Sequence, residues 1–97
     1  MKITTKSGFK CNVKENDLKS WDYVTLSARL AKETDEMKVI VMLDDLITLV
    51  LGDQKNAFLA HIAEVNGVAD TTTVIAEFKF ITEMMGEQLK KSMPSQA

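Results

Sequence analysis

The longest apolar stretch of the chain spans residues 39–51 and reads VIVMLDDLITLVL. A helix that crosses a bilayer needs about 20 apolar residues, and this stretch is shorter and carries two carboxylates. We therefore expect it in a protein core or an interface. As an α-helix, its apolar side chains cover an arc of roughly 200°, whereas a core-facing helix needs a stripe of about 100° or somewhat more.

This surplus of apolar surface predicts that the chain self-associates. A monomer could cover the whole arc only if other elements packed against both flanks of the helix, and large uncovered apolar patches usually mark interaction sites. The candidate self-association residues on this helix are Met42, Leu46, Leu49 and Val50.

Capping residues delimit this helix and predict three more. Thr34 or Asp35 can accept its first free backbone N–H groups, and Gly52 suits a left-handed end. The other helices are expected from Asn16 or Asp17 to about Lys32, from Asp53 to Asn66-Gly67, and from a cap within Asp70-Thr71-Thr72-Thr73 to about Lys91.

The first fourteen residues follow a different pattern. After Ser7-Gly8, apolar Phe9, Cys11 and Val13 alternate strictly with polar residues, which is the signal of a half-buried strand after a turn. A lone two-stranded hairpin is only marginally stable, so residues 1–14 should pack on the helices as a hairpin.

The length of 97 residues leaves room for one hydrophobic core. We therefore predict a single, mainly α domain over residues 1–97, with about four helices packed in a small bundle. Its parts are the hairpin at 1–14, the helical region at 16–91 and a frayed polar tail at 92–97.

Composition and charge exclude several classes of protein. The chain is 45% apolar and 27% charged, as in an ordinary soluble domain, and twelve basic against fourteen acidic residues give a net charge of -2. Proteins that bind nucleic acid usually carry a clustered basic surplus, so no nucleic-acid partner is expected. The first residues lack the apolar region of a secretory signal, which favours a cytoplasmic protein without a membrane partner.

No catalytic, cofactor or metal site is expected from the residues that could carry chemistry. Asp44 and Asp45 diverge by 100° on a helix, so they should not share a proton or a metal. His61, the single histidine, has no nucleophile or acid at a triad-like spacing and is interpreted as structural. Cys11 falls on the apolar face of the predicted strand, as a small core residue would. The chain is therefore not expected to be an enzyme.

The last predicted helix carries a second surplus of apolar residues. Phe80 and Met84 lie one turn apart, off the core stripe, and three acidic residues surround them: Glu77, Glu83 and Glu87. They are candidate partner-binding residues, and the alternative is that the hairpin or another helix buries them.

Several short motifs, in this order, resemble a known family. Ser7-Gly8-Phe9 leads into the alternating strand, Leu18-Lys19-Ser20-Trp21 begins the helical region, Leu51-Gly52-Asp53 ends the second helix, and Ser92-Met93-Pro94-Ser95 closes the chain. This order resembles the tail assembly chaperones of long-tailed bacteriophages that infect Gram-positive hosts. The chain departs from the family in its very apolar second helix and its short Ser/Pro tail.

The resemblance implies a non-catalytic role in the host cell cytoplasm. Such chaperones bind the tape measure protein, keep it soluble, help to recruit tail tube subunits, and are absent from the mature virion. They tend to self-associate, and many also exist in a longer form made by ribosomal frameshifting. The alternative is a small phage or host transcriptional regulator that acts as a helical DNA-binding or protein-binding module.

Overall fold

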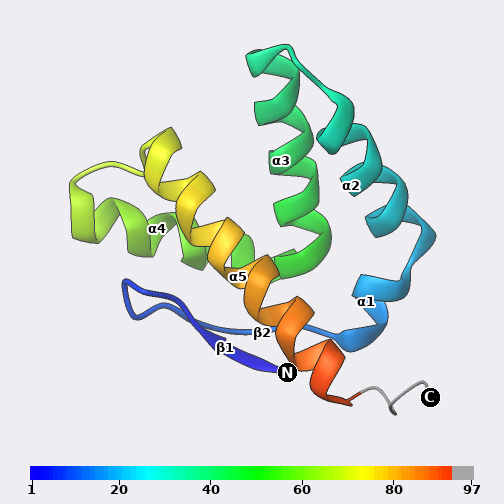
Figure 1. Cartoon of the computed structure of the whole chain (residues 1–97). Helices are drawn as coiled ribbons and strands as arrows, with labels where there is room; N and C mark the ends of the chain where they lie inside the picture. The colour runs from blue at the N-terminus through cyan, green and yellow to red at the C-terminus, as the bar shows by residue number, and fades with distance from the viewer. Residues whose placement is uncertain (93–97) are drawn as a thin grey trace.

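Four long helices and an N-terminal β-hairpin form the chain, as Figure 1 shows, and this confirms the predicted fold class. The structure is a computed structural model that describes residues 1–92, with the side chains of residues 1–88. The elements are β1 (Lys2–Thr4), β2 (Lys10–Asn12), α1 (Glu15–Lys19), α2 (Trp21–Lys32), α3 (Glu36–Leu51), η1 (Gly52–Gln54), α4 (Lys55–Asn66) and α5 (Thr71–Ser92). Residues 93–97 of the predicted tail lie outside the described residues, and Ser92 belongs to α5.

The hairpin pairs β1 and β2 in antiparallel register, with Ile3 opposite Cys11. Gly8 has a φ of 94° in the connecting turn, a conformation that residues with a side chain rarely adopt. Odd-numbered residues of the hairpin point toward the helices, and even-numbered residues point toward solvent. The two strands pass beneath α4 and α5 in Figure 1, so one face of the hairpin forms part of the core.

The first helix is not continuous, which corrects the helix predicted from Asn16 or Asp17 to Lys32. Ser20 has a ψ of 148° and separates α1 from α2. Its hydroxyl oxygen accepts a hydrogen bond from the Tyr23 N–H at 3.1 Å and donates to the Asp17 carbonyl at 2.9 Å. Serine stabilises a helix start better than a helix interior because its side chain replaces a missing backbone partner.

The remaining helix ends follow the sequence signals, with one exception. The Asp35 carboxylate accepts from the N–H groups of Met37 and Lys38, and Gly67, with a φ of 84°, ends α4. The Asp53 cap predicted for α4 is wrong, because the single 3-10 turn η1 carries the chain directly from α3 into α4.

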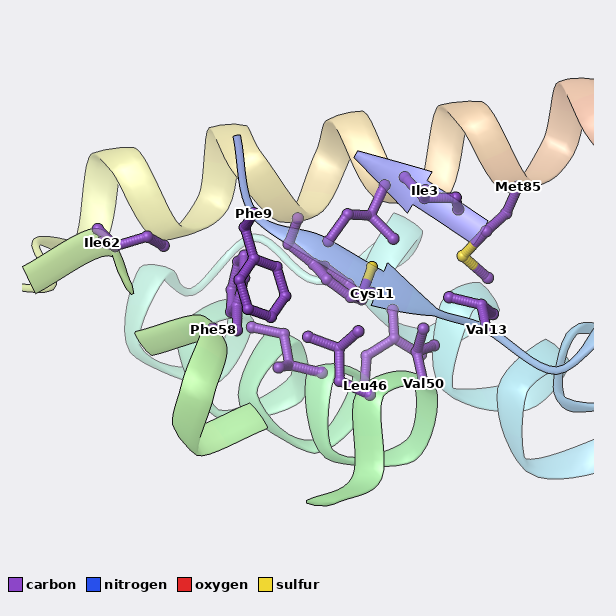
Figure 2. Packing of buried hydrophobic residues seen from close by; sticks show 13 residues of the cluster. Ile3, Phe9, Cys11, Val13, Leu46, Val50, Phe58, Ile62 and Met85 are labelled. Carbon is purple, nitrogen blue, oxygen red and sulfur yellow. The ribbon is translucent and has the colours of Figure 1, made fainter. Parts of the chain in front are cut away.

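The core lies where the hairpin, α3, α4 and α5 meet. Phe58 of α4 and Ile81 and Met85 of α5 are completely buried, and the Phe9 ring of the hairpin meets the Phe58 ring edge-on at 5.5 Å between centroids. Figure 2 shows this cluster below β2 and α5. By contrast, α2 lies at the periphery of the core: no residue of Trp21–Lys32 is fully buried and Trp21 is 79% exposed, but Tyr23, Leu26 and Leu30 pack against the core.

Candidate functional site

An apolar groove opens between the N-terminal half of α3 and the first turns of α5, with α4 at its end. Its central part is a pocket of about 170 Å³. The pocket is lined by Ile40, Leu43, Asp44, Ile47, Leu59, Ala69, Thr71, Val74, Ile75 and Phe78. Two neighbouring hollows share wall residues with it: one shares Leu43, Ile75 and Phe78, and the other shares Ile40, Thr71 and Ile75. The three lie next to one another along α3 and α5 and are together called the groove below.

The exposed apolar residues of α3 lie on its N-terminal half: Ile40 on the groove wall, and Met37 and Val41 in a separate shallow hollow of the same helix. Met37 is 70% exposed, Val41 is 60% exposed, and Ile40 on the groove wall is 38% exposed. The N-terminal half of α3 therefore presents apolar side chains both into the groove and to open solvent. In this half of α3 the side chains of Met37, Ile40 and Val41 stay exposed, whereas Leu43 packs against the core and α2 lies alongside the helix.

The structure divides the four predicted self-association residues into two pairs. Met42 and Leu49 are half-exposed, whereas Leu46 and Val50 are only 4% and 3% exposed. Figure 2 shows Leu46 and Val50 pointing toward Cys11, because the hairpin covers the C-terminal half of α3. The interpretation of Leu46 and Val50 as surface residues is therefore corrected: they pack in the core of their own chain.

Phe80 and Met84 are half-buried along the side of α5 that faces β1. The Lys6 ammonium lies 5.7 Å from the centroid of the Phe80 ring, Met84 packs against the core, and Gln88 one turn later donates to the Lys2 carbonyl at 3.5 Å. The hairpin thus covers part of this stripe. The hairpin therefore buries Phe80 and Met84 in part, and their role as partner-binding residues stays a prediction.

The tertiary structure brings together a polar cluster that sequence reasoning missed. His61 Nε2 lies 3.1 Å from both the carbonyl and the hydroxyl oxygen of Ser7, and the Ser7 N–H donates to the buried carboxylate of Glu77 at 3.1 Å. The Ser7 hydroxyl also lies 3.2 Å from that of Thr5. No spacing in the sequence signals these contacts, because 54 and 70 residues separate the partners.

This cluster ties the hairpin turn to α4 and α5. Within the turn, the Gly8 N–H donates to the Thr5 carbonyl at 3.0 Å. In the part of the chain that the structure describes, Glu77 contacts the Ser7 backbone rather than the His61 ring. The contacts of Ser7 with His61 and Glu77 therefore act as a structural tether between the hairpin turn and the two helices.

Cys11 and Asp44, two other residues considered for chemistry, are buried or paired within the fold. Burial raises the pKa of the Cys11 thiol above its usual 9.0, which disfavours the reactive thiolate. Asp44 pairs with the Lys55 ammonium at 2.7 Å, on the exposed edge of α3. Within residues 1–92, no group of three His, Cys, Asp or Glu residues is arranged to hold a metal ion. None of the helices described there combines the length and the apolarity that a membrane crossing requires.

Comparisons with family models, with curated proteins and with solved structures found no match for this chain.

Proposed function

We propose that this chain is a non-catalytic tail assembly chaperone of a long-tailed bacteriophage. It binds and solubilises the tape measure protein in the host cytoplasm, assists the assembly of tail tube subunits around it, and is not retained in the mature virion. The order of motifs from Ser7-Gly8-Phe9 to Ser92-Met93-Pro94-Ser95 supports this proposal. The apolar surface that the fold leaves uncovered supports it independently.

The observation that carries the proposal is the apolar groove between α3 and α5, with the exposed Ile40 on its wall. Met37 and Val41 add exposed apolar surface on the same half of α3, in a separate hollow. An amphipathic helix docks in such a groove by placing a few apolar anchors, three or four residues apart, into it. An extended helical partner has many such stripes, which aggregate when they are exposed to water. A groove that takes apolar side chains and covers them therefore matches the requirements of a chaperone for such a partner.

Phe80 and Met84 supply a second candidate contact. The flat ring of Phe80 and the flexible thioether of Met84 are both half-buried, and such side chains adapt to partner residues of different shapes. The exposed carboxylates of Glu83 and Glu87 lie on the same helix and would form a polar rim.

The proposal is tested by co-purification of the tape measure protein with this chain after co-expression. Ile40→Asp places a carboxylate on the wall of the groove, and we expect it to reduce the recovered tape measure protein about tenfold. Ala60→Asp adds the same charge to an exposed position of α4 and should leave recovery unchanged.

Two results would count against the proposal. If the wild-type chain recovers no tape measure protein and leaves it as insoluble as before, the chaperone function is wrong. If Ile40→Asp and Ala60→Asp recover equal amounts, the groove is not the binding surface, and Phe80 with Met84 becomes the surface to test.

A further inference from the structure

The solvent-facing side of the hairpin is strongly basic. Its exposed residues include Lys2, Lys6 and Lys10, with Thr4 and Asn12 between them, and this set is named the basic face below. The first fourteen residues contain four lysines and no acidic residue. The register sets Lys2 opposite Asn12 and Lys10 opposite Thr4, so each strand contributes a lysine beside a shorter polar side chain.

The charges of the chain are separated in space. Four of the twelve basic residues lie in the hairpin, whereas all fourteen acidic residues lie outside it, so the remainder of the chain carries a net charge of -6. In the part of the chain that the structure describes, the ion pairs are Lys19 with Glu15 and Lys55 with Asp44, and neither involves the basic face. Lys14, the fourth lysine, lines a hollow with Asp17 and Asp53 and is therefore left out of the basic face.

The edges of the hairpin are occupied, so a partner must approach its face. The backbone N–H and carbonyl of Asn12 that point away from β1 are both bonded to the Gln54 side chain. On the other side α5 packs along β1, with Gln88 bonded to the Lys2 carbonyl. A partner strand is thus hindered at both edges, and the available contacts are the lysine side chains.

We propose that the basic face is a docking surface for an acidic stretch of a partner polypeptide. Lysine ammonium groups on a flat ribbon complement carboxylates and would steer such a segment to the hairpin. This surface is separate from the apolar groove beside α3 and takes a different chemistry, so it adds a second contact to the one proposed above.

Two other kinds of occupant fit the observations less well. A nucleic acid would be repelled by the net charge of -6 on the rest of the chain, and the basic face offers no arginine. The aromatic ring beside it, that of Phe80, is half-buried and already lies against the Lys6 ammonium, which leaves it poorly placed to stack on a base. An anionic membrane usually requires apolar residues that enter the lipid, and the basic face has none. Lysines on exposed strands also oppose aggregation, but that role alone predicts no affinity for an acidic segment.

The test uses a fluorescently labelled peptide of 20 residues in which glutamate and serine alternate. Fluorescence anisotropy at low salt measures the affinity of the full chain for this peptide. Lys2→Gln with Lys10→Gln removes two charges from the basic face. The control, Lys38→Gln with Lys79→Gln, removes two charges from exposed positions of α3 and α5. The control and the hairpin variant therefore have the same net charge. Since one exposed charge pair changes an equilibrium constant about two- to fivefold, we expect about a tenfold loss for the hairpin variant and less than about twofold for the control.

Several outcomes would overturn the proposal. One is no measurable binding of the peptide by the wild-type chain, and another is an equal loss in both double variants, which would reflect net charge alone. A third is tighter binding to a DNA duplex of equal charge, or to vesicles rich in phosphatidylserine, than to the peptide. Circular dichroism of each variant establishes that the fold is retained before binding is compared.

Discussion

The side-chain amide of Gln54 pairs with the backbone of Asn12 in both directions. Its Oε1 accepts from the Asn12 N–H at 2.8 Å, and its Nε2 donates to the Asn12 carbonyl at 2.7 Å. A residue of a third antiparallel strand would make the same two bonds. Gln54 therefore closes the outer edge of β2 and joins the hairpin to the turn between α3 and α4.

Gln54→Ala should destabilise the fold by about 1–2 kcal/mol, because the side chain loses three hydrogen bonds, two to Asn12 and one to the Leu51 carbonyl. Each such bond contributes about 0.5–1.5 kcal/mol, and the two to Asn12 are exposed to solvent and should lie at the low end. Gln54→Glu should not restore stability, because a carboxylate cannot donate to the Asn12 carbonyl. Urea unfolding measures both variants, with Asn56→Ala at an exposed position of α4 as the control. An unfolding free energy equal to that of the wild type in Gln54→Ala would show that the pairing contributes nothing.

The double variant Phe80→Ala with Met84→Ala should keep its fold and weaken co-purification with the tape measure protein. Both side chains are half-buried, so truncation removes only part of a buried area, whereas the loss of an interface anchor often costs about 2 kcal/mol or more. Circular dichroism and co-purification are measured on the same preparation. Unfolding of the variant would mean that the two residues serve the core, and normal binding would move the contact to the groove beside α3.

Self-association should depend on the exposed half of α3 rather than on its buried half. Val41→Glu places a charge at a 60% exposed position, and we expect it to lower the dimer or oligomer fraction in sedimentation without loss of the fold. Leu46→Ala should instead reduce the unfolding free energy by about 2–5 kcal/mol, the usual cost of a truncated core leucine. Sedimentation of the wild-type chain as a monomer at high concentration would contradict the self-association.

Stability should depend on the ionisation of Asp70 at acid pH. Hydrogen bonds from the Thr73 hydroxyl, the Thr73 N–H and the Asn66 amide hold the pKa of Asp70 below its usual 3.8. A carboxyl whose pKa is lower in the folded state stabilises the fold at pH values above its unfolded pKa. That contribution is lost as the pH falls through the folded pKa.

The measurement is a series of urea unfolding curves from neutral pH to about pH 2, for the wild type and Asp70→Ala. The difference in unfolding free energy between them should be constant near neutral pH and should shrink below about pH 4. Thr73→Val, which removes the hydroxyl donor, should reduce the pH dependence. A difference that stays constant down to pH 2 would contradict the assigned role of the carboxylate.

Local signals in the sequence determined most of the secondary structure. Asp35, Gly52, Gly67 and Asp70 mark helix ends because capping depends on residues within about four positions of each other. The alternation after Gly8 likewise determined the hairpin and its buried face. The break at Ser20 also has a local cause, although a serine within a helical pattern does not by itself require one.

Only the tertiary structure decided which apolar residues remain available to a partner. The periodicity of residues 39–51 indicated a surplus of apolar surface but did not distinguish buried Leu46 from exposed Val41. That difference arises because the short hairpin covers only the C-terminal half of α3, and its contacts with α3 join residues far apart in the sequence. The tether between Ser7 and His61, 54 residues apart, has the same origin, since a fold can bring such residues together without any local pattern that predicts it.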